Sequence, residues 1–136
     1  MLIVDAGPLY AAAARRDRHH ARCVELLRRA TGPLIVPALV VTEVAYLLGD
    51  RIGPHAETAF ARSIASGELQ VEPVVLVDWA RIASLTAEYA DMALGMVDAS
   101  VVALAERLGA TTIASLDHRH LLAVRPNHVS SFQLVP

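Results

Sequence analysis

Cysteine, lysine and aromatic residues are scarce in this chain, and each scarcity excludes a class of protein. Cys23 is the only cysteine among 136 residues, so the chain has neither an internal disulfide framework nor a cysteine cluster for zinc. Aromatic residues make up 4% of the chain, so its core must be built from Val, Leu, Ile and Ala. All twelve basic residues are arginines, and the formal net charge of −2 argues against a general positive coat for nucleic acid.

Long hydrophobic runs and a basic leader are also missing. No uncharged apolar stretch reaches the roughly 18 residues that a membrane span requires. The apolar start lacks a preceding basic region, and Asp5 and Pro8 interrupt it, which is unlike a secretory signal peptide. These features, with the single cysteine, predict a soluble cytoplasmic protein without a membrane partner. At 54% hydrophobic residues, the length predicts one domain over residues 1–136.

Short apolar runs alternate with helical patterns along the chain. Leu2, Ile3 and Val4 run directly into Asp5, which predicts a strand buried on both faces, as in a parallel sheet. A helix is expected to begin at Asp78 as its N-cap and to place Trp79 in the core. Further strands are predicted at 34–36, 69–73, 111–114 and 132–135, and further helices at 9–14, 17–30, 38–51, 55–66 and 96–108. This alternation predicts an α/β fold with helices on both faces of a parallel sheet.

Four carboxylates interrupt apolar segments. Asp5 and Asp117 end predicted strands, whereas Glu43 and Asp98 lie near the starts of apolar helices. A buried carboxylate is costly without a compensating positive charge, and no arginine lies within a helical turn of Glu43 or Asp98. Ligand crevices of open α/β sheets form beyond the carboxyl ends of the strands, so one crevice can collect all four acids. A bound divalent cation would then supply the missing charge.

Each acid also has a purely structural interpretation. Asp5 could accept hydrogen bonds from the amides that open the next helix, and Glu43 could occupy a partly exposed helix position. Asp98 could cap its own helix, and Asp117 could cap a short helix at 118–121. The presence of four acids at corresponding places in the fold favours a common site.

The type of donor narrows the choice of cation. Oxygen ligands without a histidine or cysteine pattern suit Mg²⁺ or Mn²⁺ and argue against Zn²⁺. These ions lower the pKa of an attacking water and neutralise charge on a phosphate and its leaving oxygen. The cluster therefore predicts metal-dependent phosphoryl transfer.

Four short motifs carry a family resemblance over essentially the whole chain. They are Leu-Ile-Val-Asp at 2–5, Val-Thr-Glu-Val at 41–44, Asp-Ala at 98–99 and Ile-Ala-Ser-Leu-Asp at 113–117. In this pattern the chain resembles PIN-domain nucleases. The ending Asp-His-Arg-His at 117–120, with Arg-Pro at 125–126, is most similar to the VapC toxins of bacterial toxin–antitoxin pairs.

The resemblance implies a PIN-like three-layer α/β/α sandwich around a short, mostly parallel sheet. It implies a Mg²⁺-dependent endoribonuclease that hydrolyses tRNA or rRNA by metal-activated water. Asp5, Glu43, Asp98 and Asp117 would be the catalytic residues and would bind one or two Mg²⁺ ions, with Mn²⁺ as the alternative. The resemblance also implies a homodimer and a small antitoxin whose C-terminal segment covers the site.

Several positions near the motifs need separate interpretation. The family often has a hydroxyl residue directly after the first Asp and another at the next position, where this chain has Ala6 and Gly7. The missing hydroxyl is expected to weaken metal affinity. Ser115 fits the usual hydroxyl position before the last Asp. Asp91 corresponds to an acid of similar toxins and is interpreted as supporting the site or facing substrate, with a solvated surface acid as the alternative.

Arginines and histidines provide candidate RNA contacts. Arg15, Arg18 and Arg22 are spaced three and four residues apart and are expected on one face of the second helix. Phosphate contacts supply much of the affinity for nucleic acid, although a solvated helix face is the alternative. His118 and His120 are interpreted as surface residues, with assistance to the leaving group or contact with RNA as the alternative.

Two functions other than a ribonuclease toxin remain open. A housekeeping PIN nuclease of RNA processing would share the site, and a neighbouring gene for a short DNA-binding protein would favour the toxin instead. A non-catalytic Mg²⁺-binding signalling module, such as a receiver domain, would need a lysine at the end of a late strand. The chain has no lysine, which counts against that module.

Overall fold

The computed structural model describes all of residues 1–136, and its five strands form one sheet. The strand order is β3-β2-β1-β4-β5, and every neighbouring pair is parallel. In chain order the elements are β1 Leu2–Val4, α1 Ala6–Ala13, α2 His20–Arg29, β2 Leu34–Pro37, α3 Ala38–Arg51, α4 Pro54–Ala65, β3 Leu69–Glu72, α5 Leu76–Glu88, the 3₁₀ helix η1 Ala90–Met92, α6 Met96–Leu108, β4 Thr112–Ala114, α7 His118–Ala123 and β5 Gln133–Val135.

Strand β1 occupies the centre of the sheet. Ile3 pairs with Ile35 of β2 on one side and with Ile113 of β4 on the other. All three residues of β1 are buried, which explains why the run is apolar throughout instead of alternating with polar residues. The predicted buried parallel strand is confirmed.

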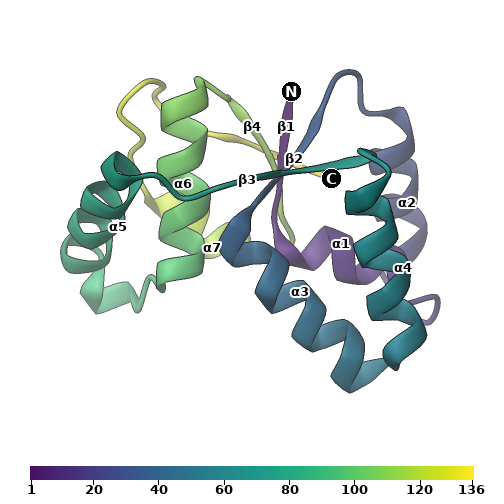
Figure 1. The fold of residues 1–136 in the computed structure, drawn as a ribbon. Helices are drawn as coiled ribbons and strands as arrows, with labels where there is room; N and C mark the ends of the chain where they lie inside the picture. The colour runs from purple at the N-terminus through teal and green to yellow at the C-terminus, as the bar shows by residue number, and fades with distance from the viewer.

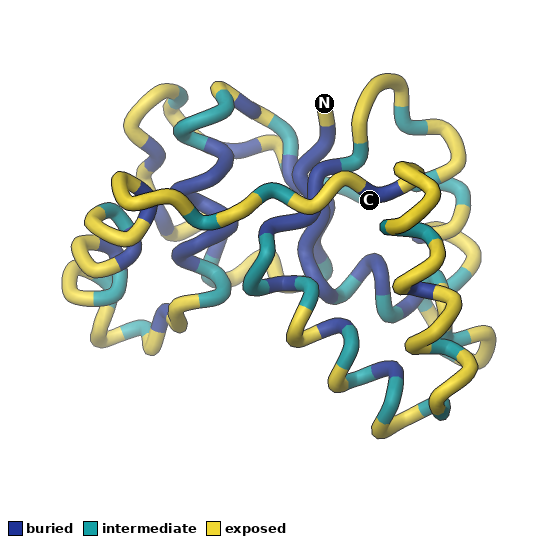
Figure 2. The backbone as a smooth tube through the Cα atoms, viewed as in Figure 1, coloured by how far each residue is buried: buried dark blue, intermediate teal, exposed yellow.

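Helices cover both faces of the sheet, so the predicted three-layer α/β/α sandwich is confirmed. Helices α5, α6 and α7 lie on one side of the strands, and α1, α2 and α4 lie on the other, with α3 extending from the end of β2 (Figure 1). Every residue of α6 from 99 to 105 is buried. Buried residues concentrate in the strands and in α6, while α4 and the start of α5 are largely exposed (Figure 2). No helix combines the length and apolar composition that crossing a membrane requires.

Two arginine networks hold α5 against the C-terminal end of α6. Arg81 donates two hydrogen bonds to Glu106, at 2.8 and 2.9 Å. Arg107 donates to Asp78 at 3.0 Å and to Glu72 of β3 at 2.9 Å. These paired charges fix the position of α6 and therefore of the acid in its first turn.

The helices predicted at 38–51 and 96–108 coincide with α3 and α6. Gly109 adopts a left-handed conformation with φ 68°, which ends α6 and is more readily accessible to glycine than to other residues. Apolar composition and a glycine stop were therefore sufficient to predict these two helices.

Three local predictions are wrong. Helix α2 begins at His20 instead of residue 17, because the Asp17 carboxylate accepts a hydrogen bond from the His19 amide at 2.7 Å and stabilises a turn. Asp78 lies within the first turn of α5, where it accepts a bond from the preceding backbone at 3.0 Å, and so is not the N-cap residue. Trp79 is 40% exposed on the outer side of the same turn and does not belong to the core.

Candidate active site

Four carboxylates from four elements face one cleft at the carboxyl ends of the central strands. Asp5 follows β1, Asp117 follows β4, Glu43 lies in the second turn of α3 and Asp98 in the first turn of α6. The cleft has a volume of about 430 Å³. Its other lining residues are Ala6, Gly7, Tyr10, Leu47, Arg51 and Leu116. The fold thus brings together the four acids that the sequence predicts at one crevice.

Asp5 is the most enclosed of the four acids, with 7% of its surface exposed. One carboxylate oxygen accepts a hydrogen bond from the Ala6 amide at 2.7 Å, and the other accepts one from the Ser115 hydroxyl at 2.8 Å. The bond to Ala6 starts α1 three residues before the predicted position. Asp5 therefore caps a helix and lines the cleft at the same time.

Burial raises the pKa of Asp5 above its usual value, although the bonds from Ser115 and Ala6 act in the opposite direction. The charge of Asp117 raises it further. Burial also raises the pKa of Glu43 and of Asp98, and the charge of Asp5 contributes to both increases. The ionised forms of these acids are thus unfavourable without a compensating cation.

Asp98 and Asp117 do not cap their helices through their side chains. Neither carboxylate accepts a hydrogen bond from the amides of its own helix. The cap interpretation of Asp98 is therefore wrong, because Gly95 is the N-cap of α6, whereas Asp117 does occupy the N-cap position of α7 without a side-chain cap bond. Glu43 is exposed, more so than its structural interpretation expects, and it still lines the cleft.

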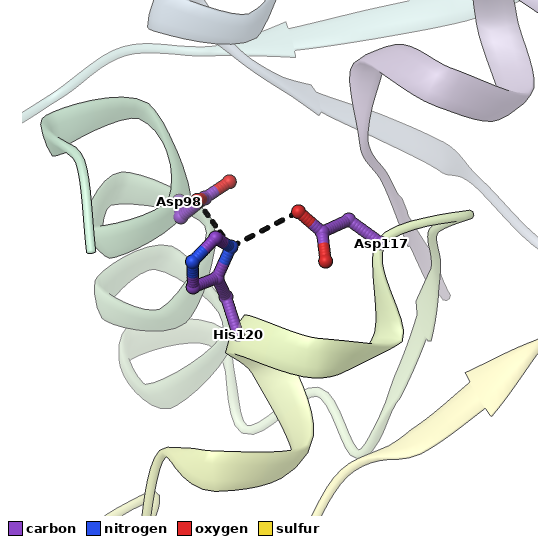
Figure 3. A group of neighbouring side chains, drawn as sticks. All are labelled: Asp98, Asp117 and His120. Atoms are coloured by element: carbon purple, nitrogen blue, oxygen red, sulfur yellow. Dashed lines mark hydrogen bonds and ion pairs between the residues drawn. The ribbon is translucent and has the colours of Figure 1, made fainter. Parts of the chain in front are cut away.

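His120 reaches from α7 toward Asp98 and Asp117 (Figure 3). Its Nδ1 lies 3.0 Å from Asp117 Oδ2 and 3.7 Å from Asp98 Oδ2, and its Nε2 lies 3.0 Å from the Met92 carbonyl oxygen. A carbonyl and a carboxylate both accept, so these contacts favour protons on both ring nitrogens. The hydrogen bond to Asp117 accordingly raises the pKa of His120. The side chain is 22% exposed, so its interpretation as a surface histidine is wrong, whereas His118 is exposed.

The donor set fits a divalent cation. Carboxylate oxygens of Asp98 and Asp117 lie within 4.8 Å of each other and of a His120 ring nitrogen, close enough for the two acids to bind one ion. No arginine forms an ion pair with any of the four cleft acids. Carboxylate oxygens suit Mg²⁺ or Mn²⁺, whereas both ring nitrogens of His120 are engaged, so this histidine would support Asp117 beside such an ion.

Two cleft residues were missed by the sequence reasoning. Arg51 ends α3 and is the only basic residue that lines the cleft. Its guanidinium carbon lies 5.4 Å from the centre of the Tyr10 ring on α1. A usable signal was present, because Glu43, Leu47 and Arg51 recur every four residues and therefore share one face of α3.

Asp91 lies outside the cleft. It is exposed in η1, and it is not among the residues that line the acidic site. Its side chain forms no ion pair with the described arginines or histidines. The structure thus does not bring Asp91 together with the four acids.

The arginines predicted to contact RNA do not share a helix face. Because α2 begins at His20, Arg15 and Arg18 belong to the turn before it. Arg22 donates a hydrogen bond to the backbone carbonyl of the C-terminal residue at 2.7 Å. Arg15 lines a second groove of about 1190 Å³ among α1, α2, α3 and α4, which adjoins the acid cleft at Tyr10 and Arg51.

A parallel α/β sandwich with an acidic cleft at its strand ends is the architecture found in PIN domains, and comparison with known proteins agrees. The chain matches the PIN domain family over residues 2–125. It is 32% identical to ribonuclease VapC26 of Mycobacterium tuberculosis over 135 residues, which cover 99% of this chain and 100% of that protein. The chain belongs to the PIN domain family, and its predicted resemblance to VapC-type members is confirmed.

Solved structures share the fold at lower sequence identity. Mycobacterium tuberculosis VapC20, described as a sarcin–ricin loop cleaving toxin, has a TM-score of 0.84 at 21% identity, covering 96% of this chain and 99% of its own. FitAcB from Neisseria gonorrhoeae has a TM-score of 0.69 at 13% identity, covering 100% and 97%. VapBC2 from Rickettsia felis, bound to a DNA fragment from their promoter, has a TM-score of 0.67 at 12% identity, covering 98% and 96%. These likenesses establish the fold.

Replacing Asp98 by Asn is expected to stabilise the metal-free protein at neutral pH. The native pKa of Asp98 is raised above the ordinary value of 3.8, so its contribution to stability is present below that value and is lost as pH rises through the native pKa. Asparagine carries no charge and avoids this loss. Urea unfolding in EDTA should give the variant the larger free energy of unfolding at pH 7, with a difference that shrinks toward pH 3.8.

The matched control is Asp50→Asn, which removes an exposed carboxylate of α3 outside the cleft. This control should not reproduce the stabilisation expected of Asp98→Asn at pH 7. Equal or greater stability of the wild type at neutral pH would contradict the cost of burying the charged Asp98 carboxylate beside Asp5.

Proposed function

We propose that the protein is a Mg²⁺-dependent endoribonuclease toxin, formed by a single nuclease domain over residues 1–136 and acting on cytoplasmic RNA. The observation that carries this proposal is the convergence of Asp5, Glu43, Asp98 and Asp117 on one cleft without an ion-paired arginine. Support also comes from the relative VapC26, which is named a ribonuclease, and from VapC20, which is described as a toxin. We infer rRNA or tRNA as the substrate class.

The four acids would hold one or two Mg²⁺ ions, with Mn²⁺ as the alternative. When bound, such an ion lowers the pKa of the attacking water and neutralises charge on the scissile phosphate. Asp5 is oriented for this role because each of its oxygens accepts one protein hydrogen bond and keeps a lone pair directed elsewhere. Ser115 would therefore affect metal binding indirectly, by orienting the Asp5 carboxylate through its hydrogen bond.

His120 would orient Asp117 in the same site. Both of its ring nitrogens are bonded, one to the Asp117 carboxylate and one to the Met92 carbonyl. This leaves no free ring nitrogen to accept a proton from water or to donate one to the leaving oxygen. Its role is therefore to fix the carboxylate and to balance part of the negative charge.

Asp5→Asn and Asp98→Asn are each expected to lower RNA cleavage by about two orders of magnitude or more, because each removes a negatively charged oxygen ligand. The measurement incubates purified protein with total RNA, with and without Mg²⁺, and maps the cut ends. Asp50→Asn serves as the matched control and should cleave like the wild type. Full activity in excess EDTA, or in either cleft variant, would rule out the metal mechanism.

The toxin assignment predicts that expression of the protein alone arrests bacterial growth. We propose a small antitoxin as the inhibitor, and the larger groove, lined mainly by apolar side chains of α1 to α4, offers it a surface. Co-expression of the adjacent gene product should restore growth. Asp98→Asn should permit growth without it, because cleavage is lost while the groove is unchanged. Normal growth at high wild-type expression would favour a housekeeping nuclease.

We also propose a homodimer, supported by an apolar surface at the start of α5. Leu76 is 87% exposed and Val77 is 64% exposed, next to the partly exposed Trp79. Contiguous exposed apolar surface marks partner contacts in many proteins. Sedimentation equilibrium at micromolar concentration should give a dimer, and Leu76→Glu should raise its dissociation constant at least about tenfold. Leu122→Glu, at an exposed position of α7, should not do so, and a wild-type monomer would contradict the proposal.

A further inference from the structure

Arg51 and Tyr10 stand at the boundary between the acid cleft and the larger groove. Both residues line both of these depressions. The Arg51 guanidinium carbon lies 5.4 Å from the centre of the Tyr10 ring, within the distance of a cation–π contact. A cation–π contact of this kind restrains the guanidinium beside the ring and leaves its N–H edges available.

Arg51 carries an uncompensated positive charge. Arg28, Arg29, Arg81 and Arg107 each form an ion pair with a carboxylate, whereas Arg51 lies within 4.0 Å of none. The residue is exposed, so its donors face solvent in the cleft. A planar guanidinium with free N–H edges matches the geometry of a phosphate group.

The positive charge continues from Arg51 into the larger groove. Arg15 and Arg16 line that groove, are exposed and form no ion pair with a carboxylate. A chain with one phosphate per nucleotide could thus leave the acid cleft beside Arg51 and meet further guanidinium groups. Arg51, Arg15 and Arg16 thus provide positive charge along a route that leads from the acid cleft into the larger groove.

An acidic protein segment fits this place less well. Glu43 lies on the same face of α3 as Arg51, and Asp5 lies in the same cleft. Peptide carboxylates next to Arg51 would therefore meet several like charges. RNA also meets these charges, but its scissile phosphate would be bound by the metal ion that the acids hold, which compensates the repulsion.

We propose that Arg51, oriented by Tyr10, binds the RNA phosphate adjacent to the scissile one and directs the strand into the larger groove. This inference rests on the proposed ribonuclease function. It assigns to the end of α3 a substrate-binding role that complements the acids. Removing the guanidinium should weaken RNA binding without altering the metal site, since Arg51 forms no ion pair with the four carboxylates.

RNA binding, measured separately from cleavage, tests this assignment. The probe is a fluorescein-labelled 20-nucleotide single-stranded RNA of mixed sequence, and Ca²⁺ replaces Mg²⁺ during anisotropy titrations at several KCl concentrations. Arg51→Ala should raise Kd about tenfold and reduce the slope of log K against log salt by about 0.7, the contribution of one phosphate contact on a single strand. Arg51→Lys should keep the slope and raise Kd less, because it keeps the charge without the planar fork.

Arg62→Ala is the matched control, because Arg62 is an exposed α4 arginine without an ion pair and lines neither depression. Thermal unfolding should show that every variant folds. Equal Kd and slope for Arg51→Ala and Arg62→Ala would overturn the proposal, as would a wild type that does not bind the probe. Loss of binding to a 12-residue oligoglutamate peptide, with RNA binding intact, would assign Arg51 to an acidic protein partner instead.

Cleavage assays keep this inference distinct from the proposed function. If the wild type cleaves RNA in Mg²⁺ while Arg51→Ala binds RNA normally, the phosphate contact is wrong and the ribonuclease assignment stands. If the wild type binds RNA through Arg51 but cleaves none, the ribonuclease assignment fails instead. A phosphate contact also predicts that Arg51→Ala raises KM more than it lowers kcat.

Discussion

The carboxylate of Asp5 lies buried at the end of the central strand, and three further acids face the same cleft. Each of Asp5, Glu43 and Asp98 has a raised pKa, mainly from burial and further from a neighbouring acid. The parallel sheet creates this situation, because all its strands end at one edge and the residues that follow them must meet there. The fold thus concentrates negative charge at a place where a bound cation would relieve the repulsion between ionised acids.

Asp5 accepts a hydrogen bond from a hydroxyl group although positions 6 and 7 carry no hydroxyl residue. The donor to its second oxygen is Ser115, which follows the neighbouring strand β4. Gly7 allows close packing at this point, since a Cβ there would lie 3.2 Å from the Cβ of Leu116. The hydroxyl that supports Asp5 therefore comes from across the sheet and not from the first turn of α1.

Local sequence patterns were sufficient to predict the strands, helices α3 and α6, and the meeting of the four acids in one cleft. The apolar run ending in Asp5 and the isolated charge of Asp98 in an apolar helix are visible without knowledge of tertiary contacts. The position of His120 was not predictable, because its partners Asp98 and Met92 lie more than twenty residues earlier in the chain. Its contacts depend on how α7 packs beside α6.

Tertiary packing also explains why the contact between Arg51 and Tyr10 was missed, whereas the start of α2 was missed for a local reason. Arg51 and Tyr10 meet only because α1 packs against α3, and no local pattern encodes that contact. The start of α2 was misplaced because the Asp17 side chain competes with the helix for a backbone amide. Periodicity detects a helix face but does not detect this competition.

Direct binding of Mn²⁺ to metal-stripped protein tests whether the acid cleft holds a divalent cation. Electron paramagnetic resonance detects the free ion, so a titration reports how many ions the protein removes from solution. The wild type should bind one or two Mn²⁺ ions, Mg²⁺ should displace them, and Ser115→Ala should weaken their binding about 10- to 100-fold. A wild-type protein that leaves all Mn²⁺ free at millimolar concentration would contradict a divalent-cation site in the acid cleft.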